Sequence, residues 1–221
     1  MIKRCFDTIL SCLGLLLLSP LLLSVAGMIL IWDGFPILFR QTRVGRNGHD
    51  FILNKFRTMT ILRDGSEGCF DVGNKKRVTR IGTFLRKAKL DELPQLWNVL
   101  KGDMSFVGPR PEVRKWVDAY PARWVKVLAV RPGITDPASI YYRNEEELLA
   151  QADDPEAFYR DHILPHKIDL YEEYVRSSSF VGDICMIFKT ILSVFLPGRY
   201  SCHRDSVSPG KTGIPSSQKE H

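Results

Sequence analysis

The chain has 221 residues, a length that suits one compact domain with an added anchor segment. Lysine and arginine number 31 and aspartate and glutamate 25, so the net charge of +6 favours an anionic partner: lipid headgroups, nucleic acid or a phosphorylated substrate. The five cysteines are scattered and contain no C-x-x-C pair. This pattern argues against zinc-binding and disulfide-stabilised proteins and favours a reducing cytoplasm.

The N-terminal segment is uncharged from 8 to 32 and rich in leucine and isoleucine, so it is long enough to enter a bilayer. A secretory signal peptide would have a shorter apolar core. A straight membrane-spanning helix would carry basic residues mainly on one flank. Here both flanks are basic, with Lys3 and Arg4 before the segment and more arginine from Arg40 onward. This symmetry favours a hairpin that returns to the same face, although a straight span remains an alternative.

Ser19 and Pro20, near the middle of this segment, predict where the hairpin is broken. Pro20 has no N–H to donate, and its ring would clash with the carbonyl of Leu16, so a kink is expected here. The Ser19 hydroxyl can bond a carbonyl that the kink frees inside lipid. We therefore predict a re-entrant membrane anchor over residues 1–34.

The segment that follows alternates apolar runs with basic clusters. Residues 35–39 and 50–53 are typical of short strands, and the glycine-rich stretch 45–48 between them is typical of a hairpin turn. In an extended segment Lys55 and Arg57 share one face. These two cations could hold a diphosphate, and a solvated basic strand beside anionic lipid explains them equally well.

Asp91 and Glu92 are adjacent carboxylates in front of a helical pattern. The apolar residues that follow repeat at i, i+3, i+4 and i+7, which places them on one helix face: Leu93, Leu96, Trp97 and Leu100. Asp91 suits the N-cap position, Pro94 the first turn and Gly102 the C-terminal stop. The sequence therefore predicts that a helix begins at the two carboxylates.

Cations bracket this predicted helix start, at Arg86 and Lys89 before it and at Lys101 and Arg110 after it. Free backbone N–H groups and the positive end of the helix dipole make such a place suited to phosphate. Two acids among cations at an anion-binding helix end are typical of phosphoryl transfer with a divalent metal. The simpler alternative is an acidic first turn that caps a surface helix.

The remaining segments complete a fold-class prediction of α/β, mostly α. Residues 60–79 are polar and glycine-rich, as in a mobile loop over a site. Residues 113–128 mix aromatic and basic side chains, which fits helices at the membrane interface or in a soluble core. We expect a compact catalytic domain over 35–196, with amphipathic interfacial helices and a small β-hairpin, and a disordered tail over 197–221.

Several motifs occur in order along the chain and together match one family. After the anchor with Ser19-Pro20 come Lys55-Phe56-Arg57-Thr58-Met59, Leu90-Asp91-Glu92-Leu93-Pro94-Gln95, Asn98-Val99-Leu100-Lys101-Gly102-Asp103-Met104-Ser105, Val107-Gly108-Pro109-Arg110-Pro111 and Arg131-Pro132-Gly133-Ile134-Thr135. From about Lys3 to about Leu192 the chain resembles the bacterial sugar transferases, the small monotopic polyprenyl-phosphate phosphoglycosyl transferases. Each motif alone is a weak signal, and the ordered set is specific.

The resemblance implies an enzyme that moves a sugar 1-phosphate from a UDP-sugar to a polyprenyl phosphate, usually undecaprenyl phosphate, and releases UMP. This step begins the assembly of O-antigen, capsule, exopolysaccharide or glycoprotein glycans. The implied partners are the UDP-sugar, the lipid phosphate and the bilayer, without nucleic acid, and a homodimer is compatible with them. The implied location is the cytoplasmic face of the bacterial inner membrane, with Ser19-Pro20 as the hairpin break.

The resemblance also implies roles for single residues. Asp91 would be the nucleophile of a covalent phosphosugar intermediate and the Mg²⁺ ligand, and Glu92 a base or an orienting group. Arg86 and Arg110 would bind phosphoryl oxygens. After the Arg-Pro-Gly-Ile-Thr motif many members continue Gly-Trp-Ala-Gln-Val, whereas this chain has Asp-Pro-Ala-Ser-Ile at 136–140. Sugar preference is therefore not carried over from the family.

Two other functions compete with this interpretation. A glycosidase also uses paired carboxylates, but these must flank the scissile bond, and neighbours on a helix point in different directions. A non-enzymatic basic membrane adaptor explains the charge and the anchor, but it does not explain two carboxylates surrounded by cations. The adaptor predicts that Asp91→Asn is harmless.

Overall fold

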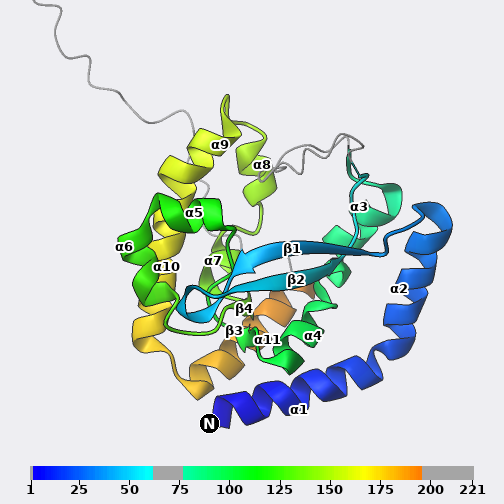
Figure 1. Ribbon diagram of the computed structural model, residues 1–221, viewed down its shortest axis with the longest axis horizontal. Coiled ribbons are helices and arrows are strands. Elements are labelled where there is room, and N and C mark those ends of the chain that lie inside the picture. The colour runs from blue at the N-terminus through cyan, green and yellow to red at the C-terminus, as the bar shows by residue number, and fades with distance from the viewer. Residues whose placement is uncertain (1, 62–76, 196–221) are drawn as a thin grey trace, which may run out of the picture.

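The structure is a computed structural model that describes residues 2–61 and 77–195. Two long N-terminal helices run along two edges of the molecule, and a β-hairpin crosses its middle; α3 and α4 (within 80–101) lie beside the N-terminal helices, and α5, α6, α8, α9 and α10 (within 114–177) lie on the opposite side (Figure 1). Most of the loop predicted over 60–79, and the tail predicted over 197–221, lie outside the described residues.

The anchor segment forms two helices, α1 (Ile2–Leu17) and α2 (Ser19–Trp32), bent by 60°. Pro20 lies in the first turn of α2, and the Ser19 hydroxyl donates to the carbonyl oxygen of Leu16 at 2.7 Å. A bend therefore lies at Ser19-Pro20, as predicted, and its insertion into a membrane stays a prediction. In the part of the chain that is described, no helix is long and apolar enough to cross a bilayer alone, whereas the bent pair together meets that requirement.

Both ends of this helix pair are attached to the same folded domain. Lys3 near the start of α1 donates to the Val107 carbonyl at 2.8 Å and pairs with the Asp183 carboxylate at 2.6 Å. Just beyond the end of α2, the Asp33 carboxylate accepts a 2.8 Å hydrogen bond from the Thr79 hydroxyl. The chain thus leaves the domain through α1 and returns to it after α2.

The central β-hairpin pairs β1 (Leu38–Val44) with β2 (Asp50–Phe56) in antiparallel register, and a short 3₁₀ turn, η1 (Arg46–Gly48), joins them. The predicted hairpin is confirmed, although its first strand runs from 38 to 44 rather than from 35 to 39, and its second strand extends to 56 rather than to 53. Asn47 and Gly48 adopt positive φ angles of 58° and 79°, a conformation suited to asparagine and glycine in tight turns.

A second sheet of two short parallel strands, β3 (Ser105–Val107) and β4 (Gly133–Thr135), holds the segment after β3. A side chain at Gly133 would lie 2.1 Å from the backbone nitrogen of Gly108, so glycine is required for this close approach. The Gly133 N–H donates to the Pro109 carbonyl at 3.0 Å. The Gly-Pro-Arg-Pro motif is therefore fixed to β4 at its first half.

The other helical elements surround these sheets. In chain order they are α3 (Arg80–Lys87), the 3₁₀ turn η3 (Leu90–Glu92), α4 (Gln95–Lys101), α5 (Arg114–Ala119), α6 (Pro121–Val127), α7 (Pro137–Tyr141), α8 (Glu145–Leu149), α9 (Pro155–Phe158), the π-helix η4 (Tyr159–Ile163), α10 (Leu164–Ser177) and α11 (Phe180–Phe195). Described residues are thus mostly helical, as the fold-class prediction states.

The largest apolar core lies among α5, α6 and α10. Trp116, Trp124 and Ile168 are buried in it, so the helices predicted over 113–128 belong to a core and not mainly to a membrane interface. Smaller clusters join β2 to α2 and α3, and β2 to α4. By contrast, α11 exposes apolar side chains that include Val181 and Phe188.

Candidate active site

The Asp91-Glu92 pair lies in η3 and not at the start of a regular α-helix. Lys89 enters this turn with a left-handed backbone, φ 56°, and α4 begins only at Gln95, after Pro94. Asp91 therefore does not cap α4, contrary to the sequence prediction. Pro94 ends the tight turn just before the helix, because it has no N–H to donate to a preceding carbonyl. Gly102 does end α4, as predicted, with φ 96°.

The buried face of α4 also differs from the predicted apolar stripe. Trp97 is 53% exposed, whereas Asn98 is buried. The Asn98 side chain donates to the Ile52 carbonyl at 2.7 Å and accepts from the Asn54 N–H at 3.1 Å. Asn98 thus ties α4 to β2, and this polar contact decides which face of the helix is turned inward.

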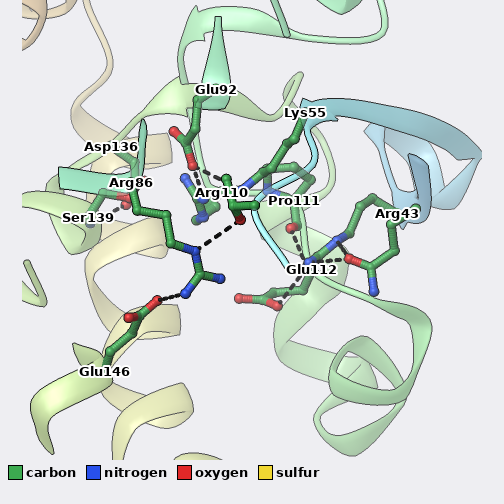
Figure 2. A network of polar contacts seen from close by, with 12 residues as sticks. Arg43, Lys55, Arg86, Glu92, Arg110, Pro111, Glu112, Asp136, Ser139 and Glu146 are labelled. Carbon is green, nitrogen blue, oxygen red and sulfur yellow. Dashed lines mark hydrogen bonds and ion pairs between the residues drawn. The ribbon is translucent and has the colours of Figure 1, made fainter. Parts of the chain in front are cut away.

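Glu92 is the centre of an ion cluster that three separate elements build (Figure 2). The Arg110 guanidinium, from the loop after β3, donates to Glu92 Oε1 at 2.5 Å, and the Lys55 ammonium, from β2, does so at 2.9 Å. Burial opposes ionisation of Glu92, but these two cations outweigh it and hold the pKa of Glu92 well below its usual range. Glu92 is therefore an ionised counterion that fixes Arg110 and Lys55 together.

Asp91 is in a different electrostatic state from its neighbour. Its side chain is buried, with 9% of the residue exposed, and its Oδ1 atom has no hydrogen-bond partner among the described residues. Burial raises the pKa of Asp91; the Lys55 cation opposes this rise, and the Glu92 charge adds to it. An unpaired carboxylate oxygen in a buried site is costly, and such atoms are typical of groups that have a chemical role.

The unpaired Asp91 oxygen is also the atom best suited to a divalent cation. In residues 2–61 and 77–195 there is no group of three or more histidine, cysteine, aspartate or glutamate residues that could hold a metal ion. Mg²⁺ commonly takes only one or two protein carboxylates and completes its shell with water and substrate phosphate oxygens. Asp91 fits such a partly protein-bound ion.

Arg86 approaches the site from α3. Its Nε donates to the Thr58 hydroxyl at 3.2 Å, and its Nη1 pairs with the Glu146 carboxylate on α8 at 3.1 Å (Figure 2). The Arg86 charge is among those that lower the pKa of Asp91, so it acts within electrostatic reach of that carboxylate. The structure thus brings Arg86, Arg110 and Lys55 to one region around Asp91 and Glu92.

Arg57 has a different place from the one the sequence predicts. Its guanidinium donates to the backbone carbonyls of Asp33, Gly34 and Phe35 at 2.5 to 2.9 Å, where α2 joins the domain. β2 ends at Phe56, so the strand alternation that would place Arg57 beside Lys55 does not continue to it. We therefore assign Arg57 to the junction of the hairpin with the domain and not to phosphate binding.

A second set of buried charges, which the sequence analysis missed, lies behind Arg110. Glu112 accepts a 2.7 Å hydrogen bond from the Tyr159 hydroxyl and pairs with Arg43 at 3.4 Å (Figure 2). The only sequence signal for it was the position of Glu112 directly after the Gly-Pro-Arg-Pro motif. Arg43 lies in the arginine-containing stretch from Arg40 onward, and nothing in that stretch indicates its pairing with Glu112.

The segment at 136–140, where the chain departs from the family pattern, begins α7. The buried Asp136 carboxylate accepts from the Ser139 N–H at 2.9 Å and also from the Ser139 hydroxyl, while Pro137 takes the first helical position. Burial raises the pKa of Asp136, and the hydrogen bonds from Ser139 oppose that rise. The Asp-Pro pair is thus a helix N-cap, which accounts for these two residues structurally.

Comparisons with known proteins cover most of the chain. A family model described as Bacterial sugar transferase matches residues 1–197. A UDP-N-acetylgalactosamine-undecaprenyl-phosphate N-acetylgalactosaminephosphotransferase from Aeromonas hydrophila is 36% identical over 196 residues, which cover 87% of this chain and 43% of that protein. A UDP-glucose:undecaprenyl-phosphate glucose-1-phosphate transferase from Caulobacter vibrioides is 45% identical over 196 residues, with 87% and 69% covered.

The exopolysaccharide production protein ExoY from Rhizobium meliloti is 34% identical over 211 residues, which cover 89% of this chain and 86% of that protein. The present chain therefore spans most of ExoY but less than half the length of the Aeromonas protein. All of the site residues described above lie inside the range that the family model matches.

Proposed function

Because the chain belongs to the bacterial sugar transferase family, we propose that it transfers a sugar 1-phosphate from a UDP-sugar to undecaprenyl phosphate and releases UMP. The product would be the first lipid-linked intermediate of a bacterial surface glycan. One observation carries this proposal: a buried carboxylate with an unpaired oxygen, Asp91, lies beside a carboxylate that two cations hold ionised, Glu92. This arrangement suits a nucleophile at phosphorus, where cations offset charge repulsion.

In the first step, an Asp91 carboxylate oxygen attacks the phosphorus atom that carries the sugar. The bond from this phosphorus to the oxygen bridging it to the uridine-bearing phosphate breaks, and that oxygen leaves with the electron pair as part of UMP. Arg86 and Arg110 neutralise negative charge on the phosphoryl oxygens. The enzyme then carries the sugar phosphate as an acyl phosphate, a mixed anhydride, on the Asp91 carboxylate.

In the second step, a phosphate oxygen of the lipid attacks the same phosphorus atom, and the bond to Asp91 breaks. The Asp91 carboxylate is restored, and the product is a polyprenyl diphosphate sugar. The lipid phosphate is largely ionised at neutral pH, so this step needs no strong base. Glu92, with its lowered pKa, is poorly suited to accept a proton and acts as an orienting counterion for Arg110 and Lys55.

Mg²⁺ fits the unpaired oxygen of Asp91 and would supply charge neutralisation for the diphosphate of the donor when bound. The remaining work belongs to the chain itself. Lys55 and Arg110 keep Glu92 ionised, and Arg86 is free to exchange its solvent-exposed Glu146 partner for a substrate phosphate.

The helix pair α1–α2 supplies the location of the reaction. A re-entrant insertion on the cytoplasmic face of the bacterial inner membrane is supported by two features. Both ends of the pair contact one domain, and the bent region between them exposes large apolar side chains such as Leu13, Leu17 and Leu21. This insertion brings the site to headgroup depth, where the phosphate of the acceptor lies.

The test is mass spectrometry of the purified chain in detergent with Mg²⁺ and a panel of UDP-sugars, without lipid. We expect a sugar-phosphate adduct on Asp91 and stoichiometric UMP release, and neither with Asp91→Asn. UMP release only after undecaprenyl phosphate is added would favour direct transfer without a covalent intermediate. If a folded protein gives neither an adduct nor UMP release with any donor, the transferase proposal is contradicted. The non-enzymatic membrane adaptor is then the favoured function.

A further inference from the structure

The position of the Arg110 guanidinium depends on how its backbone is held. Pro109 and Pro111 flank Arg110, and each ring restricts its own backbone and that of the residue before it. On the N-terminal side the Pro109 carbonyl accepts from the Gly133 N–H of β4 at 3.0 Å. The support on the C-terminal side comes from Glu112, two residues after Arg110.

Glu112 is bound at both its main chain and its carboxylate. Its carbonyl accepts the Val44 N–H at 2.9 Å, which attaches it to the end of β1. Its Oε1 accepts from the Tyr159 hydroxyl at 2.7 Å, and its Oε2 pairs with Arg43 Nη1 at 3.4 Å. Only 6% of Glu112 is exposed, so these contacts act with little competition from water.

Arg43 connects this carboxylate to the loop that carries Arg110. The same Nη1 atom that pairs with Glu112 donates to the Pro111 carbonyl at 3.1 Å, while Nε and Nη2 donate to the Gln41 side chain at 3.0 and 2.7 Å. The Arg43 guanidinium thus has a fixed orientation, and it lies within electrostatic reach of Arg110. The two cations repel each other, and a nearby negative charge offsets that repulsion.

The charges around Arg110 therefore form two layers. Glu92 faces the Arg110 guanidinium from the reaction side, and Glu112 neutralises Arg43 behind it. Removal of the Glu112 charge would leave Arg43 as a partly buried cation without its carboxylate partner, which is unfavourable. The loop can reduce the repulsion between Arg43 and Arg110 by moving Pro111 and Arg110 away from Arg43.

We propose that Glu112 is a positioning residue for the transfer reaction: through Arg43 and Tyr159 it holds the Arg110 guanidinium against Glu92 in the orientation that receives the phosphoryl group. This inference rests on the proposed function, and it extends the site to a buried layer that makes no contact with substrate. The network continues from Tyr159 to Lys167 at 3.4 Å, and Lys167 pairs with Glu145 at 2.5 Å next to the Glu146 that binds Arg86. The charge network around Glu112 thus reaches α8, the helix that also carries the exposed Glu146 partner of Arg86.

The first measurement is the rate of UMP release by the full chain with UDP-glucose and UDP-N-acetylgalactosamine, for wild type, E112Q and E156Q. Glu156 is the matched control, because it is also a glutamate paired with a cation, Lys115, but on the surface. We expect E112Q to lower kcat/KM about 10-fold, because small displacements of a positioning group cost one to two orders of magnitude in rate. E156Q should stay within about 2-fold of wild type.

A double-mutant cycle separates positioning from general structural support. If Glu112 acts through Arg110, E112Q should cost about 10-fold in the wild-type background and less than about 2-fold in an R110K background. Equal costs in both backgrounds would show that Glu112 only supports the fold and would overturn the proposal. Y159F, which removes a single donor and keeps every charge, should show a smaller loss of the same kind if E112Q does not yield folded protein.

A second readout does not depend on catalysis. Phenylglyoxal modifies exposed guanidinium groups, and the modified Arg110 peptide can be quantified by mass spectrometry. We expect at least about 3-fold faster modification of Arg110 in E112Q than in wild type or E156Q, since a guanidinium released from its carboxylate loses its protection. Unchanged labelling would overturn the inference. Wild type that releases no UMP with any donor would contradict the proposed function alone, and the labelling would still decide the role of Glu112.

Discussion

Two regions of the molecule differ in the kind of side chain that they bury: the site around Asp91 and Glu92, and the core among α5, α6 and α10. In the core the buried side chains are mostly apolar or aromatic, and the polar edge of Trp124 is satisfied by the Trp116 carbonyl at 3.2 Å. The site instead buries charges and, among the described residues, leaves the Asp91 Oδ1 atom without a hydrogen-bond partner, whereas the core leaves only a neutral hydroxyl, that of Tyr171, in this state. The core therefore stabilises the fold, whereas the buried charges of the site cost free energy and are suited to the reaction.

This difference can be measured, because substitutions in the site should change mainly the reaction rate and substitutions in the core mainly the free energy of unfolding. In the site, removal of the Asp91 charge should abolish the reaction and leave the fold intact or more stable. In the core, removal of methyl groups should weaken the fold and leave the reaction of the folded fraction intact. The following expectations run from the largest effect to the smallest.

Asp91→Asn should lower the rate of UMP release by at least about 10³-fold, because an amide cannot serve as the nucleophile. Its unfolding free energy in EDTA at neutral pH should be equal to that of wild type or higher by about 1 kcal/mol, since a buried charge with an unpaired oxygen is removed. UMP release together with thermal unfolding checks this. A variant that is active and less stable than wild type would show that Asp91 supports the fold and is not the nucleophile.

Ile168→Ala should act in the opposite way. Ile168 is fully buried on α10, and loss of its side chain creates a cavity that costs about 2–5 kcal/mol of unfolding free energy. The specific activity of the folded protein should change by less than about 2-fold, because Ile168 has no polar group that could take part in the network of Glu92, Arg110 and Glu112. Ile168→Val is the graded control and should cost about 0.5–1.5 kcal/mol in the same urea titration. A large loss of specific activity without loss of stability would break the proposed separation.

The adjacent carboxylates should make opposite contributions to the pH dependence of stability. The pKa of Glu92 is lowered by Arg110 and Lys55 against the effect of burial, so the unfolded chain binds its proton more readily. Glu92 therefore adds stability above its unfolded pKa of about 4.3 that is lost as pH falls through its folded pKa. The pKa of Asp91 is raised by burial, so stability falls as pH rises between its unfolded and folded values.

Unfolding free energies measured in EDTA across the acid range should show both slopes. E92Q should flatten the loss of stability on acidification, and Asp91→Asn should remove the decrease that sets in above its unfolded pKa of about 3.9. E156Q, on the surface, is the control for a glutamate outside the site. Identical pH profiles for wild type and E92Q would show that Glu92 is not held by Arg110 and Lys55 in solution.

Local signals in the sequence were sufficient where a few neighbouring residues decide the conformation. The Ser19-Pro20 break, the turn at 45–48 and the stop at Gly102 follow from ring geometry and glycine freedom, and all three are present. The clustering of Arg86 and Arg110 with the two carboxylates was expected from the motif order. Each of these inferences needed only the chemistry of residues near in sequence or a known pattern.

Long-range contacts decided the rest. The inward face of α4 follows from the bonds of Asn98 to β2, and Arg57 is bound by carbonyls some twenty residues before it. The Glu112–Tyr159 contact joins residues 47 positions apart. Helical periodicity and strand alternation describe one element at a time, so they cannot show which distant polar group will bond a given side chain.

The smallest effect should come from an ion pair that belongs to neither region. Arg114 and Asp50 pair at 2.6 Å on the surface, with 47% and 49% of their side chains exposed. Asp50→Asn should change the unfolding free energy by no more than about 0.5 kcal/mol, because water and salt screen an exposed pair. Its UMP release should equal that of wild type. A loss comparable to that of E92Q would mean that ion pairs stabilise this fold wherever they lie, and the contrast between site and core would then rest on the apolar residues alone.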